Sequence, residues 1–107
     1  MFEQWDIVEF SFSPARGHEP LGRRPALVVS NRHYNIGTSL TLACPITTAD
    51  NGFPLHFRLP SDLDTTGFVA VEQLRALDLV AREARRIERL QDQALRAAIA
   101  ECVRSFV

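Results

Sequence analysis

The sequence contains no lysine, so all 12 of its fully cationic side chains are arginine. Arginine suits bidentate contacts with phosphate better than lysine does, but the bias extends over the whole chain and marks no particular site. The 13 acidic residues leave a net charge of −1, which excludes a protein that binds nucleic acid through its overall charge. Any nucleic-acid binding must therefore depend on a local patch.

Residues that commonly bind metals are scarce and poorly spaced. The two cysteines, Cys44 and Cys102, form no Cys-x-x-Cys pair, and no second cluster completes a zinc site. The three histidines, His18, His33 and His56, show no metal-ligand spacing either. We therefore expect no metal and no cofactor, and the cysteines are predicted to be buried free thiols.

Long apolar runs and targeting signals are also missing. No run approaches the roughly 18 apolar residues of a membrane-spanning helix, and residues 1–6 lack the basic start and apolar core of a signal peptide. A cytoplasmic protein with no membrane partner is expected. At 107 residues and 46% hydrophobic content, the chain fits one domain, residues 1–107, with a core that needs no disulfide.

Alternating apolar and polar residues predict a series of short strands. The predicted strands are residues 6–12, 26–30, 39–46, 54–59, 68–74 and 85–90, with a turn at 31–37. Asp92 is a candidate N-cap for an amphipathic helix of about four turns. Its apolar face is predicted from Leu95, Ala98, Ile99, Cys102, Val103 and Phe106. This pattern predicts a mainly β (α+β) fold, a small curled sheet or barrel with a C-terminal helix packed on it.

The most unusual stretch is residues 17–25, which opens with glycine and ends with proline beside an apolar strand. Arg24 could hold a phosphate or stabilise charge in a transition state, or it could pair with Glu19 at the surface. Glu19 and His18 could transfer protons near neutral pH, or their side chains could stabilise a turn. Arg23 reads as a solvated neighbour, so both kinds of role stay open for this segment.

Polar residues at two strand ends form a second group of candidates. Thr47 and Thr48 follow an apolar strand, where their hydroxyls could bind phosphate or cap the next turn. Glu72, Gln73 and Arg75 end another apolar strand, and they could contact a ligand or mark the exit of the strand into solvent.

Several motifs occur in a fixed order between Asp6 and about Arg89. They are Asp6-Ile-Val, Pro14-Ala-Arg-Gly-His-Glu19, Gly22-Arg-Arg-Pro25-Ala-Leu-Val-Val-Ser-Asn31, Cys44-Pro-Ile-Thr47-Thr and Val71-Glu-Gln-Leu-Arg-Ala-Leu-Asp78. Together they resemble the MazF/PemK toxins. The chain departs from the family pattern at Trp5, where glycine is usual, and at Pro20, where glutamine is usual. We expect a local backbone effect at Trp5, and a stiffer loop with altered substrate choice at Pro20.

The resemblance implies an SH3-like barrel of about five to seven strands. It also implies a homodimeric toxin that is neutralised by a small cognate antitoxin with an acidic or disordered tail. The implied activity is a metal-independent endoribonuclease that cuts single-stranded RNA, such as mRNA, at a short sequence. Attack by the ribose 2′-OH would leave a 2′,3′-cyclic phosphate and a 5′-hydroxyl.

The resemblance also implies roles for particular residues. Arg24 would stabilise the phosphorane charge, Thr47 would hydrogen-bond the scissile phosphate, and Glu19 would act as base or orient Arg24. The implied RNA contacts are Arg16, His18, Arg23, Thr48, Gln73 and Arg75.

Two alternatives use the same fold. A CcdB-like gyrase poison would bind a protein target through its C-terminal helix without catalysis, and a degenerate relative would only bind RNA or an antitoxin. The pair Arg24 and Thr47 argues against the gyrase poison, because a pure binder has no need of it.

Overall fold

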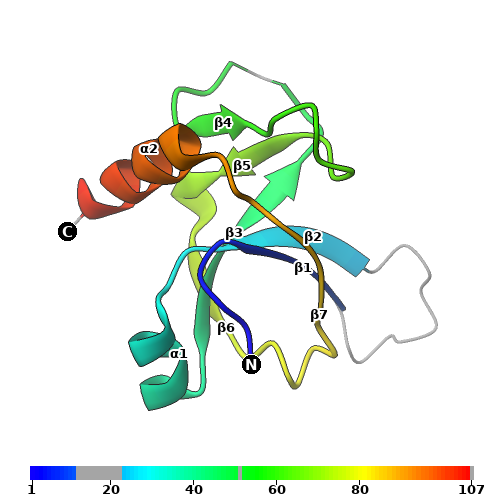
Figure 1. The fold of residues 1–107 in the computed structure, drawn as a ribbon, viewed down its shortest axis with the longest axis vertical. Helices are drawn as coiled ribbons and strands as arrows, with labels where there is room; N and C mark the ends of the chain where they lie inside the picture. Colours follow the sequence, from blue (N-terminus) through cyan, green and yellow to red (C-terminus); the bar gives the residue numbers. More distant parts are fainter. Residues whose placement is uncertain (12–22, 51, 107) are drawn as a thin grey trace.

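The computed structural model describes residues 1–11, 23–50 and 52–106, which form a seven-stranded antiparallel sheet with two α-helices (Figure 1). In chain order the elements are β1 (Asp6–Ser11), β2 (Arg23–Val28), α1 (Arg32–Thr38), β3 (Thr41–Thr47), β4 (His56–Arg58), β5 (Phe68–Ala70), the 3₁₀ turn η3 (Val71–Gln73), β6 (Arg75–Leu77), β7 (Arg85–Arg89) and α2 (Gln93–Arg104). The mainly β prediction with a C-terminal helix is confirmed.

Strand β3 joins two parts of the sheet. The strand order is β4-β5-β3-β2-β1-β7, and β6 also pairs with β3. On one edge, the first half of β3 pairs with β6 through Thr41–Ala43, and its end pairs with β5 through Ile46 and Thr47. Pro45 lies between these two partners, at a point of the edge where its missing N–H interrupts no ladder.

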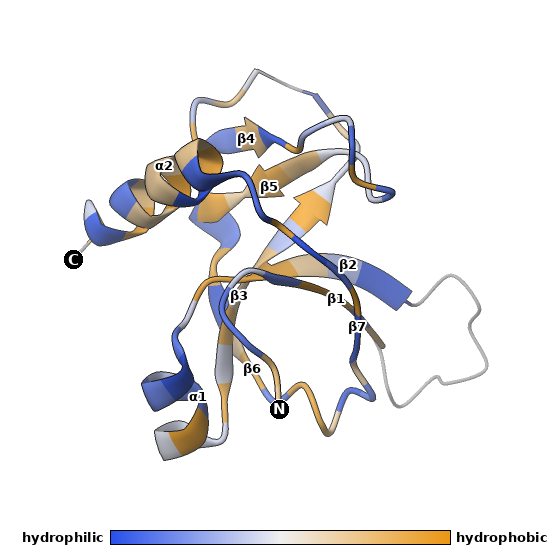
Figure 2. Ribbon diagram, viewed as in Figure 1, coloured by the Kyte–Doolittle hydropathy of each residue, from blue (hydrophilic) through white to orange (hydrophobic). Residues whose placement is uncertain are grey.

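The sheet buries apolar side chains on both faces, because successive residues of a strand point to opposite sides. Ile7 pairs with Leu27 on the face that α2 covers, in a cluster that includes the fully buried Ile99 of that helix. Val8 pairs with Ala26 on the second face. The second cluster comprises Val8, Phe10, Ala26, Val28, Ala43, Leu77 and Leu79. In Figure 2, β2 begins hydrophilic and becomes hydrophobic toward its end.

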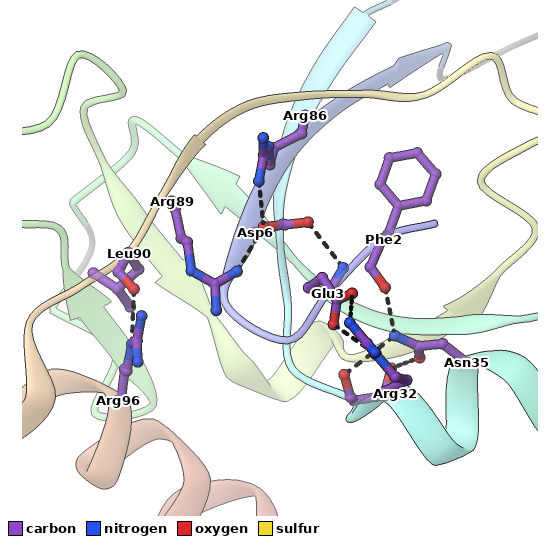
Figure 3. Close-up of polar contacts among 10 residues, drawn as sticks. Phe2, Glu3, Asp6, Arg32, Asn35, Arg86, Arg89, Leu90 and Arg96 are labelled. Atoms are coloured by element: carbon purple, nitrogen blue, oxygen red, sulfur yellow. Dashed lines mark hydrogen bonds and ion pairs between the residues drawn. The ribbon is translucent and has the colours of Figure 1, made fainter.

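Buried Asp6 fixes the start of β1 (Figure 3). Its side chain is only 2% exposed, and it accepts hydrogen bonds from Arg89 at 2.9 Å and from the Glu3 backbone N–H at 2.8 Å. Arg86 lies 3.7 Å from the same carboxylate. A buried carboxylate needs such partners, so these contacts tie the N-terminal segment and β7 to β1.

Helix α2 begins as predicted at Asp92, whose carboxylate accepts a hydrogen bond from the Leu95 N–H at 2.9 Å. It is shorter than predicted, with 12 residues. The predicted apolar face was wrong at Ala98 and Phe106, which are exposed. The rest of that face packs into the first core cluster.

Two other sequence predictions were wrong. The predicted turn at 31–37 contains helix α1, because the Asn31 side chain accepts a hydrogen bond from the Tyr34 N–H and caps a short helix. The predicted strand 68–74 ends at Ala70, where η3 turns the chain from the end of β3 to its beginning. The chain then forms β6, which the sequence analysis missed.

Candidate active site

Arg24 lies in strand β2 rather than in a loop. The hairpin of β1 and β2 continues past the predicted start of the strand, with Phe10 opposite Arg24 and Ser11 opposite Arg23. Alternation places Arg24 on the same face as Ala26 and Phe10, which belong to the second core cluster. The strand thus carries an exposed guanidinium to the rim of an apolar surface.

A hollow of about 170 Å³ brings three predicted site residues together. Its polar lining is Arg24 of β2, Gln73 of η3 and Arg75 of β6, and its apolar lining is Phe10, Ala26, Ala43, Pro45 and Leu77. The residues meet because β3 pairs with β2 on one edge and with β6 on the other. The volume is below the roughly 300–1,000 Å³ of small-molecule pockets, so the hollow suits one group of a larger substrate.

The charge of this hollow favours anions. Arg24 and Arg75 supply two guanidinium groups, and no carboxylate is among the described side chains that line it. Guanidinium groups beside apolar walls attract phosphate and bind it through paired N–H groups. The arrangement can hold a phosphate and stabilise negative charge that develops on it.

Thr47 is close along the strands but is not among the residues that line the hollow. It lies two positions beyond the Ala26–Pro45 pair, as Arg24 does on the other strand, so both residues are at the same end of β2 and β3. Its Oγ1 accepts a hydrogen bond from the Ala49 N–H at 3.1 Å. This contact is the turn-capping role that the sequence allows for Thr47, and it leaves the hydroxyl hydrogen available for a second partner.

Arg23 contacts the protein rather than the hollow. Its Nη2 donates to the backbone oxygens of Glu9 at 3.0 Å and of Glu83 at 2.9 Å, and its Nε donates to the Glu9 carboxylate. Hydrogen bonds from Arg85, together with those from Arg23, lower the pKa of the Glu9 carboxyl. These contacts anchor the start of β2 beside Arg24, while an RNA contact by Arg23 stays a prediction.

The other predicted site residues are only partly placed. Arg16, His18 and Glu19 lie outside the described residues, so their roles stay predictions. Thr48 is exposed directly after β3. The described residues contain no group of three or more side chains able to hold a metal ion.

Sequence reasoning missed a hydrogen-bonded pair, His56 of β4 and Glu72 of η3, in which only the His56 side chain is buried. The His56 side chain is only 7% exposed, and its Nε2 lies 2.8 Å from Glu72 Oε2. Gln73 Nε2 donates to the same oxygen at 3.3 Å. Burial alone would raise the pKa of the Glu72 carboxyl, but hydrogen bonds from His56, from Gln73 and from its own backbone lower it below its usual range.

The cysteines behave largely as expected. Cys44 is buried in the first core cluster, and burial raises the pKa of its thiol to about 12. Cys102 is only half-buried on α2. In the part of the chain that the structure describes, no helix is both long enough and apolar enough to cross a membrane.

Comparison with known families decides the identity of the chain. Residues 3–107 match the PemK-like, MazF-like toxin family of type II toxin-antitoxin systems. The chain belongs to this family. It is 42% identical to the endoribonuclease toxin ChpB of Escherichia coli K12, over 92% of this chain and 88% of that protein. It is 34% identical to the E. coli K12 endoribonuclease toxin MazF, over 74% of this chain and 70% of that protein.

Solved structures show the same fold. A MazE–MazF structure from Deinococcus radiodurans has a TM-score of 0.82 and 30% identity, and covers 98% of this chain and 93% of that one. A mycobacterial endoribonuclease in complex with its cognate antitoxin has a TM-score of 0.76, but at 15% identity it shows only the fold. This match covers 100% of this chain and 98% of the mycobacterial chain. The predictions of a MazF-like fold and of a toxin-type endoribonuclease are confirmed.

Proposed function

We propose that this PemK/MazF-family toxin cleaves single-stranded RNA at a short sequence, without a metal ion, at the hollow between β2, β3 and β6. The observation that carries the proposal is the meeting of Arg24, Gln73 and Arg75 around one hollow. Two guanidinium groups offer anchorage to a phosphate, and the amide offers hydrogen bonds to a base or sugar.

The proposed reaction is an internal transesterification. The ribose 2′-OH loses its proton as its oxygen attacks the adjacent phosphorus, and the 5′-oxygen gains a proton as its bond to phosphorus breaks. The products are a 2′,3′-cyclic phosphate and a 5′-hydroxyl end. Arg24 stabilises the charge on the phosphorane oxygens through N–H donors. It cannot supply the proton to the leaving oxygen, because arginine stays protonated in proteins.

Thr47 and Glu19 complete the proposed site. The Thr47 hydroxyl accepts from Ala49, so its own hydrogen is free to donate to a phosphate oxygen. Glu19 either takes the proton of the 2′-OH or orients Arg24. Arg75 and Gln73 hold the neighbouring part of the RNA, with Arg16, His18, Arg23 and Thr48 as further contacts.

The proposed partners follow from the family. Solved relatives are described as MazE–MazF complexes and as an endoribonuclease with its cognate antitoxin, which supports a small cognate antitoxin for this chain. We further propose that the toxin acts as a homodimer in the cytoplasm, where its mRNA substrate is found.

The test is cleavage of a single-stranded RNA in the presence of EDTA. We expect cleavage with 5′-hydroxyl ends and a loss of about 10²–10³-fold in rate for Arg24→Ala, the typical effect of removing a donor that stabilises transition-state charge. The control is Arg104→Ala, which removes an exposed arginine of α2 and should leave the rate unchanged. A need for a divalent metal, or full activity of Arg24→Ala, would refute the proposal.

A further inference from the structure

The hydrogen-bonded group of His56, Glu72 and Gln73 links a buried side chain to the hollow. His56 belongs to β4, opposite Ala70 of β5, and its ring packs edge-on to Phe53 with 5.4 Å between ring centres. Its side chain is more than nine-tenths buried, and its Nδ1 has no hydrogen-bond partner among the described residues. The ring is therefore held in place mainly by packing and by its single bond to Glu72.

The chemistry of Glu72 fixes the direction of both its hydrogen bonds. An ionised carboxylate only accepts hydrogen bonds, so His56 must present a protonated Nε2 to it. For the same reason Gln73 must turn its NH₂ group, and not its oxygen, toward Glu72. A carboxyl with the ordinary pKa of 4.5 is ionised at neutral pH, and the pKa of Glu72 is lower still.

The second branch of the Gln73 amide is a carbonyl oxygen, which points away from the branch that Glu72 holds. Gln73 lines the hollow with Arg24 and Arg75. We propose that Glu72, held by His56, is a positioning residue that fixes the Gln73 amide with its oxygen toward the substrate. Position 73 thereby selects an RNA base that carries an amino group over one with a carbonyl oxygen at the same place.

This inference rests on the proposed RNA cleavage and adds the chemical basis of base choice. A free glutamine amide can rotate and offer either its donor or its acceptor, so it discriminates poorly between amino and carbonyl groups. An amide locked by a carboxylate offers only the acceptor. A base that presents a carbonyl oxygen then leaves two acceptors facing each other, which is strongly disfavoured.

The experiment first maps the cleavage motif of the wild-type protein by sequencing 5′-hydroxyl ends. Synthetic RNAs with this motif then carry inosine for one adenosine, or uridine for one cytidine, which replaces one amino group with a carbonyl oxygen. We expect one position where the wild-type kcat/KM falls by about tenfold or more on this exchange. In Glu72→Gln, the ratio of the kcat/KM values for the amino and carbonyl RNAs should approach one at that position. The new amide at position 72 can also donate a hydrogen bond, so the Gln73 amide is free to turn either way.

A double-variant comparison separates positioning from a structural role. Gln73→Met should also abolish the preference, and Glu72→Gln should add nothing to it in the Gln73→Met background. Glu101→Gln, an exposed change on α2, is the control that keeps the wild-type preference. Should Glu72→Gln fail to fold, Glu72→Ala, which removes the acceptor that orients the Gln73 amide, should likewise abolish the preference, and a retained preference would overturn the inference.

Three results would overturn the inference. If Glu72→Gln slows the cleavage of all RNAs equally and keeps the ratio, the residue is merely structural. If the wild type shows no position with an amino preference, or if Gln73→Met keeps it, position 73 does not select the base. Intact RNA with the wild-type protein would instead refute the proposed function itself.

Discussion

Trp5 occupies a backbone conformation that normally favours glycine. Its φ is +76°, its N–H donates to the Val28 oxygen at 2.7 Å, and its own oxygen accepts from the Leu90 N–H at 2.9 Å. Left-handed backbone costs a non-glycine residue about 1–2 kcal/mol. The side chain offsets this cost because Trp5 is only 9% exposed and belongs to the first core cluster. The positive φ at position 5 is a backbone conformation that glycine adopts without strain.

Replacing Trp5 with glycine should therefore destabilise the protein despite relieving the backbone. Loss of a buried tryptophan costs about 3–5 kcal/mol and relief of the left-handed backbone returns about 1–2 kcal/mol, so a net loss of about 2 kcal/mol is expected. Urea unfolding measures it. Trp5→Ala, which loses the ring and keeps a β-carbon, should be about 1 kcal/mol less stable than Trp5→Gly. A Trp5→Gly variant as stable as the wild type would contradict this explanation.

At the scale of elements, strand β5 sets the position of the end of β3. Gly67, just before β5, has a φ of +128°, and a β-carbon there would lie 2.4 Å from the Thr47 carbonyl oxygen. Phe68 then pairs with Thr47 in the ladder. Backbone contact this close requires glycine, so Gly67 lets β5 pack against the strand end that carries Thr47.

Gly67→Ala should displace Thr47 and lower activity. We expect loss of stability by about 2 kcal/mol or more from the clash and the strained φ, and a fall in RNA cleavage of about tenfold or more because misplaced catalytic groups are costly. Gly52→Ala is the matched control. It also has a positive φ, of +72°, but its β-carbon would meet nothing within 4 Å, so stability should fall modestly with cleavage unchanged. Equal cleavage rates in the two variants would show that Gly67 does not position Thr47.

Elements differ in how well the sequence predicts them. Alternating apolar and polar residues identified β1, β3 and β7 as strands, although β1 and β3 bury side chains on both faces and β7 is largely exposed. It missed β6, since the run from Phe68 onward stays apolar through Val71 while the chain turns at η3. The break is imposed by β3, which changes partner at this point. Pairing between distant segments is not visible in local periodicity.

In the candidate site, too, the sequence identifies individual residues but not the contacts between distant segments. Arg24, Gln73 and Arg75 were identified from motifs in the sequence, and their meeting depends on the pairing of β2 and β6 with β3. The His56–Glu72 pair could not be predicted, because 16 residues separate its members and only the β4–β5 ladder joins them. A lone histidine in a short strand carried no signal of this contact.

Over the whole molecule, ionised carboxylates tie the sheet together. Glu9 bonds to Arg23 and Arg85 across three strands, and Glu88 accepts backbone hydrogen bonds from Asp64 and Thr65. The pKa of Glu9 is lowered chiefly by Arg85. Burial alone would raise the pKa of Glu88, but hydrogen bonds from the Thr65 side chain and from these backbone N–H donors lower it. Both groups therefore release their protons more readily in the folded chain than in the unfolded chain.

The expected consequence is a loss of stability in acid. Because the folded-state pKa of these carboxyls is below the ordinary 4.5, their contribution is complete above that pH and disappears as the pH falls through the lowered values. Urea unfolding between pH 7 and pH 3 should show a nearly constant free energy of unfolding down to about pH 5 and a decline below it. Glu9→Gln should be less stable at neutral pH and show a shallower acid decline, whereas Glu101→Gln, in an exposed pair on α2, should follow the wild type. A wild-type stability that stays constant or rises from pH 5 to pH 3 would mean that these carboxylates do not stabilise the fold, because protonation could then remove nothing from it.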